Sequence, residues 1–320
     1  MVFNITECVD FHHGKRIVIT ILVCGHDVVI IMHKEGDALL IQQPVYYPFR
    51  EVIEDNGRIF VNNQLHYEDG KYTIDFEDFE KKIVDNNVKV FILCNPHNPV
   101  GRVWTKEELE KMGDICLKHN VVIMDDEIHC DFTYPGFKFT SFMTLDEKYH
   151  NSLVLYTSPS KTFNVAGLQP ANIIIKNPEL RAAYRKANAA AGYSQGSIMG
   201  QVAVKSVYTK GDEWVNELVE YITGNMNYVR DFVKENFPKA QFVDPEGTYL
   251  TWVDFSGYGF TDEELEHIMV EEAHLWLDSG KVFGPATAQF ERFNLACPRA
   301  TVVKAMEQLK AALDNHTKWA

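Results

Sequence analysis

The sequence predicts an α/β fold, with a large domain on a mostly parallel sheet and a smaller C-terminal α+β domain. From residue 38 onward, short apolar runs alternate with segments of helical periodicity, which is the pattern of β-α-β units. After about residue 208 the pattern changes to one long helical segment followed by strand-like pieces. We therefore expect a large domain over residues 1–208 and a small domain over residues 209–320.

Short apolar runs give the strands of the large domain. They cover residues 38–42, 88–94, 121–124, 153–157 and 172–175. Between the second and third runs, Thr105 and Glu108 have the spacing of a capping box, which marks the start of a helix. Apolar residues at helical spacing continue to Asn120, so this stretch is predicted to be a β-α-β unit.

The small domain is predicted to contain helices and strands in succession. A helical pattern over residues 212–236 ends before Pro238, and strand-like segments follow at residues 240–243 and 249–255. Thr261 and Glu264 form a second capping box, and a last helical pattern covers residues 300–314.

Charge and cysteine content exclude several classes of protein. The 31 Lys and Arg residues against 45 Asp and Glu residues give a net charge of −14 without a basic run, so nucleic acid is not an expected partner. The six cysteines form no C-x-x-C pair, which favours reduced thiols and a cytoplasmic location. The apolar stretch at residues 17–32 is interrupted by Gly25, His26 and Asp27, so it predicts no membrane span.

Two polar motifs directly follow predicted strands. In N-P-H-N-P-V-G at residues 95–101, the prolines and the glycine place Asn98 on a loop at the carboxyl edge of the sheet, where α/β folds bind ligands. In D-D-E-I-H at residues 125–129, a buried carboxylate could hold a ligand cation, and a helix-capping acidic cluster is the alternative. A metal site is not expected, because H-E-x-x-H spacing and a thiolate partner are lacking.

A lysine and an arginine complete the set of candidate residues. Lys161 lies in a Ser/Pro/Gly-containing loop at residues 157–168, where desolvation would lower its pKa and make it a Schiff-base nucleophile. Ser158 and Lys161 also match the S-x-x-K of acyl-serine hydrolases, but S-D-N and K-T-G do not occur in the chain. Arg299 follows an apolar run and could bind a substrate carboxylate, or else form a surface ion pair.

The order Asn98, Asp126, Lys161 and Arg299 resembles that of the fold-type I pyridoxal-phosphate enzymes, the aspartate aminotransferase superfamily. The resemblance is strongest to carbon–sulfur lyases of the cystathionine β-lyase type. It is carried by residues 44–49 (P-V-Y-Y-P-F), 95–101, 126–129 and 158–169, and it extends from about residue 34 to the C-terminus. It implies pyridoxal 5'-phosphate as the cofactor.

The resemblance implies a role for each residue of the cofactor site. Lys161 would form a Schiff base with the cofactor and, once released, move the Cα proton of the substrate. Asp126 would pair with the pyridine N–H. Asn98 would bind the ring 3-oxygen, with His129 as a second candidate at the same edge.

Three further roles follow from the same resemblance. Tyr46 would stack on the cofactor ring, Ser158 would bind the phosphate, and Arg299 would bind the substrate α-carboxylate. The position of that carboxylate would determine which Cα bond reacts. A homodimer and a small amino-acid substrate are also implied.

The resemblance does not extend to residues 1–33. The family has a phosphate-binding turn that begins a helix just before Lys34, and no such turn occurs in this segment. We therefore expect the chain to be N-terminally truncated or divergent before Lys34; the alternative is a divergent but working strand-turn-helix.

Three functions remain open from the sequence. The first is a carbon–sulfur β-lyase that converts cystathionine or related L-cysteine thioethers into pyruvate, ammonia and a thiol. The second is an aminotransferase, which would use the same residues. The third is a homologue with an impaired cofactor site.

Overall fold

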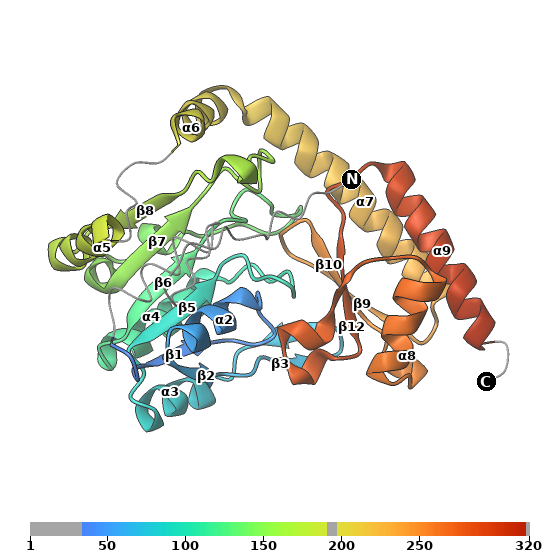
Figure 1. Ribbon diagram of the computed structural model, residues 1–320, viewed down its shortest axis with the longest axis horizontal. Coiled ribbons are helices and arrows are strands. Elements are labelled where there is room, and N and C mark those ends of the chain that lie inside the picture. The colour runs from blue at the N-terminus through green and yellow to red at the C-terminus, as the bar shows by residue number, and fades with distance from the viewer. Residues whose placement is uncertain (1–33, 191–196, 318–320) are drawn as a thin grey trace.

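The computed structural model describes residues 34–190 and 197–317, and its main element is a six-stranded sheet with the order β2-β1-β5-β6-β7-β8 (Figure 1). Its strands in chain order are β1 (Ala38–Ile41), β2 (Ile59–Asn62), β5 (Val90–Cys94), β6 (Val122–Asp126), β7 (Leu153–Thr157) and β8 (Asn172–Ile175). Neighbouring strands are parallel except for β7 and β8, which are antiparallel. The predicted mostly parallel sheet is confirmed.

Helices cover both faces of this sheet (Figure 1). The helices α3 (Phe76–Asp85) and α4 (Lys106–Lys118) pack on one face, and α2 (Pro48–Asp55) and α5 (Pro178–Ala190) pack on the other. Side chains alternate between the faces along a strand, so Leu40 of β1 packs in the core beside α3 and Leu39 packs beside α2. Burial on both faces explains why the predicted strands are continuous apolar runs.

The predicted start of α4 is confirmed in detail. Thr105 accepts a hydrogen bond from the Glu108 N–H at 3.1 Å, and the Glu108 carboxylate accepts one from the Thr105 N–H at 2.9 Å. The bounds of β7 and β8 match the prediction, those of β1, β5 and β6 differ from it by one or two residues, and β2 was not predicted. The important shift is in β6, which continues to Asp126 and so makes this carboxylate the last residue of its strand.

A second, antiparallel sheet has the order β11-β12-β10-β9. Its strands are β9 (Gln241–Val243), β10 (Leu250–Asp254), β11 (Asp278–Ser279) and β12 (Phe290–Asn294). Trp252 and Phe290 on one face join the core of the large sheet, whereas Val253 and Phe293 on the other face join a core formed with helices. The small sheet is therefore buried on both faces and joins the two cores.

Three helices cover the outer face of the small sheet. They are α7 (Asp212–Asn236), α8 (Asp262–His267) and α9 (Arg299–Thr317), and α7 and α9 lie side by side (Figure 1). The predicted helix over residues 212–236 is confirmed, as is the capping box of Thr261 and Glu264. The last helix is slightly longer than the predicted 300–314.

The remaining elements are short or peripheral. A hairpin joins β3 (His66–Glu68) and β4 (Lys71–Thr73), and Gly211 separates α6 (Ile198–Lys210) from α7. Short 3₁₀ turns cover Phe142–Thr144, Glu147–Ser152, Ala166–Leu168, Ser256–Tyr258, Gly280–Phe283 and Pro285–Thr287, and a π-helical turn covers Ile268–Glu272. The domain boundary at residue 208 stays a prediction; Phe132 and Tyr134 from before it pack in the core of the helices that follow it.

Two expectations concern parts of the chain that the structure does not describe. The divergent N-terminus at residues 1–33 and its apolar stretch at residues 17–32 both lie outside the described residues. Within residues 34–190 and 197–317, every helix is too short or too polar to cross a membrane.

Candidate active site

Three of the predicted site residues come from the carboxyl ends of adjacent parallel strands. Asn98 lies in the loop after β5, Asp126 ends β6, and Lys161 lies in the loop after β7. In the register of the sheet, Asp126 lies opposite Cys94 of β5 and Tyr156 of β7. Because the carboxyl ends of parallel strands meet at one edge, these segments form one site.

Asn98 is fixed by an arginine from the small sheet. The Asn98 side chain is 5% exposed, and its Oδ1 accepts a hydrogen bond from Arg292 Nη1 at 2.8 Å. Its Nδ2 donates no hydrogen bond within the described residues and remains available to a ligand oxygen. Arg292 thus brings a positive charge to the edge of the parallel sheet.

Asp126 can ionise near neutral pH. Burial raises the pKa of Asp126 to about 6, while the Ile128 N–H and the Lys161 ammonium oppose that rise. Its Oδ1 accepts the Ile128 N–H at 3.1 Å, and its Oδ2 has no hydrogen-bond partner in the described part of the chain. A partly buried carboxylate with one free oxygen suits a cationic N–H donor.

Lys161 has the surroundings expected of an amine nucleophile. Burial lowers the pKa of Lys161, the Asp126 carboxylate raises it, and the Arg292 guanidinium lowers it further, with a net decrease. A lower pKa leaves more of the amine unprotonated near pH 7, which is the reactive form.

His129 and two tyrosines enclose the same space. His129 is 3% exposed, and burial together with the charges of Lys161 and Arg292 lowers its pKa to about 3, so the ring is neutral. Its Nδ1 is buried and has no hydrogen-bond partner among residues 34–190 and 197–317. The His129 ring lies 5.3 Å from that of Tyr249, and Tyr46 has a pKa raised mainly by burial. Each tyrosine carries a neutral hydroxyl and an aromatic face.

Ser158 is buried, but its hydroxyl interacts within its own loop. Ser158 Oγ lies 2.5 Å from the Pro170 carbonyl oxygen and 2.8 Å from Ser160 Oγ, and it accepts the Ser160 N–H at 3.1 Å. These contacts shape the loop that carries Lys161. Phosphate binding by Ser158 stays a prediction.

The structure does not bring Arg299 to this site, which corrects the sequence prediction. Arg299 is the first residue of α9, its Nε donates to Asn225 Oδ1 at 2.7 Å, and its guanidinium lies 5.1 Å from the centre of the Tyr228 ring. Both partners belong to α7, so Arg299 joins two helices of the small domain. The arginine that acts on Lys161, His129 and Tyr46 is Arg292.

Two residues of the site, Arg292 and Tyr249, were not predicted from the sequence. Arg292 lies within β12, two positions after the buried Phe290 and so on the same face of the strand, beside Trp252 of β10. That alternation is visible in F-E-R-F-N and places Arg292 on the same face as Phe290, but it does not show that this face meets the site. The choice of Arg299 assumed that the residue after the apolar run carries the chemistry. Tyr249 has no comparable signal, because it depends on a contact between distant segments.

The site therefore contains an amine, a carboxylate, a neutral imidazole, two tyrosine rings and a guanidinium. Arg292 Nε is buried without a partner within the described residues, as is His129 Nδ1. These unpaired groups fit a planar ligand with an acidic ring N–H and a second ligand with a carboxylate. Within the described residues, there is no group of three or more His, Cys, Asp or Glu side chains that could hold a metal ion.

Comparison with known proteins identifies the family of the chain. Residues 24–309 match the sequence profile of the family described as aminotransferase class I and II. Cystathionine beta-lyase PatB of Bacillus subtilis (strain 168) is 41% identical over 278 residues, covering 87% of this chain and 72% of that protein.

Solved structures give the same relationship. Cystalysin from Treponema denticola, whose structure contains a pyridoxal 5'-phosphate cofactor, superposes with a TM-score of 0.89 at 38% identity, covering 91% of this chain and 74% of its own. The pyridoxal-phosphate-bound C-S lyase from Staphylococcus hominis, complexed with L-cycloserine, has a TM-score of 0.85 at 34% identity, covering 92% and 72% of the two chains. The resemblance identified from the motifs is confirmed, and the chain belongs to the aminotransferase class I and II family.

Proposed function

We propose that this chain is a pyridoxal-phosphate-dependent carbon–sulfur β-lyase for cystathionine or related L-cysteine thioethers. The observation that carries the proposal is the convergence of Lys161, Asp126 and Arg292 at one edge of the sheet. The lyase names of PatB and of the Staphylococcus hominis structure support the choice of reaction.

The described side chains fit pyridoxal phosphate as a cofactor. Lys161 would bind its aldehyde carbon, and the free oxygen of Asp126 would accept the ring N–H. The Asn98 amide and His129 lie at the same edge and would bind the ring 3-oxygen, and Tyr46 would cover the ring. Ser158 is retained as the proposed phosphate ligand. When bound, the cofactor supplies an electron sink for the negative charge that develops at the substrate Cα.

Arg292 is the proposed ligand of the substrate α-carboxylate. Nη1 is held by Asn98, Nη2 is paired with Asp278, and the buried Nε is unpaired within the described residues. Asp278 is 45% exposed, so a carboxylate that approaches Arg292 can displace it towards solvent. Fixing the carboxylate sets the Cα–H bond in the direction needed for proton removal.

Lys161 is the proposed base. Its lowered pKa would leave Nζ, when it is not bonded to the cofactor, able to take the Cα proton of the substrate. Loss of the proton allows the Cβ–S bond to break with the electron pair leaving on sulfur. Addition of water to the remaining fragment gives pyruvate and ammonia, and protonation of the thiolate gives the thiol.

An aminotransferase is the second candidate, because it would use Lys161, Asp126 and Arg292 for the same proton removal. The two reactions differ in products. A lyase releases pyruvate from L-cystathionine without a second substrate, whereas an aminotransferase needs a 2-oxo acid to complete its cycle. Measuring pyruvate with and without added 2-oxoglutarate separates them, and a chain that binds no cofactor would fit the impaired homologue.

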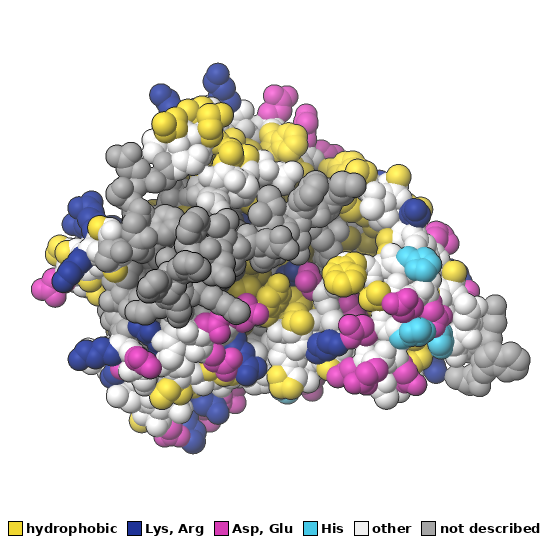
Figure 2. All heavy atoms as spheres, in the orientation of Figure 1, with side chains coloured by type: hydrophobic (Ala, Val, Ile, Leu, Met, Phe, Trp, Pro, Cys, Tyr) yellow, Lys and Arg dark blue, Asp and Glu magenta, His cyan; other side chains and the backbone are white. Residues whose placement is uncertain are grey.

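A homodimer and a cytoplasmic location complete the proposal. Exposed apolar side chains gather over α6, seen at the top of Figure 2, and include Ile198, Met199, Val202 and Tyr208. Large apolar side chains in one exposed patch favour a protein interface. Sedimentation of the purified protein tests the dimer, since a mass of one chain at micromolar concentration would reject it. Cell fractionation tests the location.

A further inference from the structure

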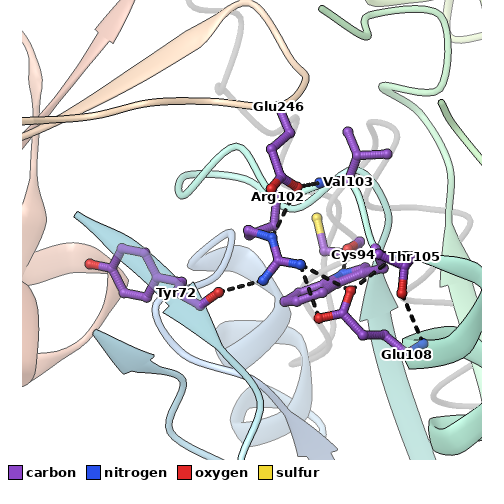
Figure 3. Close-up of polar contacts among 8 residues, drawn as sticks. Tyr72, Cys94, Arg102, Val103, Thr105, Glu108 and Glu246 are labelled. Carbon is purple, nitrogen blue, oxygen red and sulfur yellow. Dashed lines mark hydrogen bonds and ion pairs between the residues drawn. The ribbon is translucent and has the colours of Figure 1, made fainter. Parts of the chain in front are cut away.

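Arg102 uses its whole guanidinium to join three separate segments of the chain (Figure 3). Its Nε donates to Glu246 Oε2 at 2.9 Å, its Nη2 donates to both oxygens of Glu108 at 2.9 Å, and its Nη1 donates to the Tyr72 carbonyl. The guanidinium also lies 4.7 Å from the centre of the Trp104 ring. The side chain is only 14% exposed, so solvent screens these contacts weakly.

The two carboxylates belong to different parts of the fold. Glu108 is in the first turn of α4, six positions from Arg102, and its carboxylate also accepts a hydrogen bond from the Thr105 N–H. Glu246 is 144 positions from Arg102, in the turn between β9 and β10, and its Oε2 also accepts the Val103 N–H at 2.8 Å. The Glu108 contact is therefore local, whereas the Glu246 contact joins the two sheets.

The contact between Arg102 and Glu246 connects the loop that carries Asn98 to the turn that leads to the strand beside Arg292. On one side, the Arg102 carbonyl accepts the His97 N–H at 2.8 Å, next to Asn98 in the loop after β5. On the other side, the turn that contains Glu246 leads into β10, whose Trp252 is paired with Arg292 of β12. The turn is further attached by the N–H groups of residues 246 and 247, which both donate to the Gly101 carbonyl.

We propose that Arg102 is a positioning residue, which acts through Glu246 to set the separation of Asn98 and Arg292 and thereby the binding of the substrate carboxylate. Arg102 is on the loop of Asn98, and Glu246 is on the turn that leads to the strand beside Arg292. The 2.8 Å hydrogen bond between Asn98 and Arg292 joins the same two parts of the fold at a second point. The inference rests on the proposed function, since it assigns Arg292 to the carboxylate.

A matched pair of variants tests this role in the holoenzyme. Glu246→Gln and Glu108→Gln both remove a carboxylate that is 22% exposed, lies 2.9 Å from Arg102 and accepts one further backbone N–H. The probe is 3-(methylthio)propionate, which has the carboxylate and thioether of a substrate but no amine. Its dissociation constant is measured by calorimetry, which does not require turnover, and thermal unfolding is recorded for both variants.

We expect Glu246→Gln to weaken binding of the probe at least fivefold and Glu108→Gln to change it by less than twofold, with similar losses of thermal stability. Equal effects on binding in the two variants, or no binding by the unmodified enzyme, would overturn the proposal. If Glu246→Gln does not fold, Arg102→Lys replaces it, since Lys keeps the charge but cannot reach both carboxylates. Arg102→Lys is expected to give the same fivefold loss, and unchanged binding would reject the role.

The same experiment separates this inference from the proposed function. Weaker probe binding in Glu246→Gln, with no release of pyruvate from L-cystathionine by the unmodified enzyme, would support the positioning role and reject the lyase. Normal pyruvate release by the unmodified enzyme, with equal probe binding in both variants, would support the lyase and reject the positioning role.

Discussion

Arg292 and Asn98 lie 194 positions apart, and Arg292 Nη1 donates a 2.8 Å hydrogen bond to Asn98 Oδ1. This bond joins the small antiparallel sheet to the edge of the parallel sheet, where Asp126 and Lys161 lie. The site is therefore shared between the two sheets, and its geometry depends on how they are held together.

Removal of Arg292 should weaken substrate binding much more than removal of Arg299. Loss of a buried partner of a carboxylate costs about 2 to 5 kcal/mol, so Arg292→Ala should raise the KM for L-cystathionine roughly 30-fold to several thousand-fold. Arg299→Ala removes contacts to Asn225 and Tyr228 and should lower thermal stability with little change in KM. Steady-state kinetics of pyruvate release measures both. A larger KM increase for Arg299→Ala would restore the assignment made from sequence.

Asp126 should make cofactor binding depend on pH. Because burial raises the pKa of Asp126 to about 6, the carboxylate is protonated in the unliganded protein below pH 6 and ionised above it. Affinity for pyridoxal phosphate should fall about tenfold for each pH unit below 6 through this group. The Asp126→Asn variant should bind pyridoxal phosphate more weakly than the unmodified protein at pH 8, and its affinity should not show this decrease below pH 6. Absorption titrations of both proteins between pH 5 and 8 measure the difference, and parallel profiles would contradict the assignment.

Glu291 should lower stability at alkaline pH. This carboxyl is 2% exposed, and burial together with Glu266 and Asp278 raises its pKa to about 8. The unfolded chain loses this proton near pH 4.5, so the free energy of unfolding decreases as pH rises from 4.5 to 8. Glu291→Gln should be more stable than the unmodified protein by on the order of 3 to 5 kcal/mol at pH 9 and nearly equal to it at pH 5. Urea unfolding at the two pH values tests this, and a difference that does not depend on pH would contradict it.

Gly101 should not tolerate a side chain. Its φ is +73°, and an added Cβ would lie 2.9 Å from Pro245 Cα and still closer to Pro245 Cβ. Gly136 has a φ of +98° with no atom within 4 Å of an added Cβ, so Gly136→Ala reports the backbone strain alone. We expect Gly136→Ala to cost about 1 to 2 kcal/mol and Gly101→Ala about 3 kcal/mol or more. Equal losses in urea unfolding would show that the contact with Pro245 contributes nothing.

The part of the site that follows the parallel strands could be predicted from the sequence. Asn98, Asp126 and Lys161 each follow or end a short apolar run, and the topology of parallel sheets brings such positions to one edge. The capping box of Thr105 and Glu108 was equally visible, because it depends only on neighbouring residues. The capping box depends on residues close together in the chain, and the positions of Asn98, Asp126 and Lys161 follow from a rule that holds for parallel sheets in general.

The contributions of the small sheet could not be predicted in the same way. Arg292 reaches Asn98 only because Trp252 and Phe290 pack the small sheet against the first core, and no motif near Arg292 encodes that packing. The contact between Arg102 and Glu246 also depends on segments 144 positions apart. Arg299 was chosen because it follows an apolar run, but the first turn of α9 directs it towards α7 instead.

The most direct test of the central claim is the visible absorption spectrum of the purified chain with added pyridoxal phosphate, recorded beside that of Lys161→Ala. We predict a visible absorption band of a lysine-bound cofactor in the unmodified protein and its absence in the variant, together with release of pyruvate from L-cystathionine by the unmodified protein alone. Equal spectra would contradict the assignment of Lys161, and a Lys161-dependent band without pyruvate release would contradict the lyase.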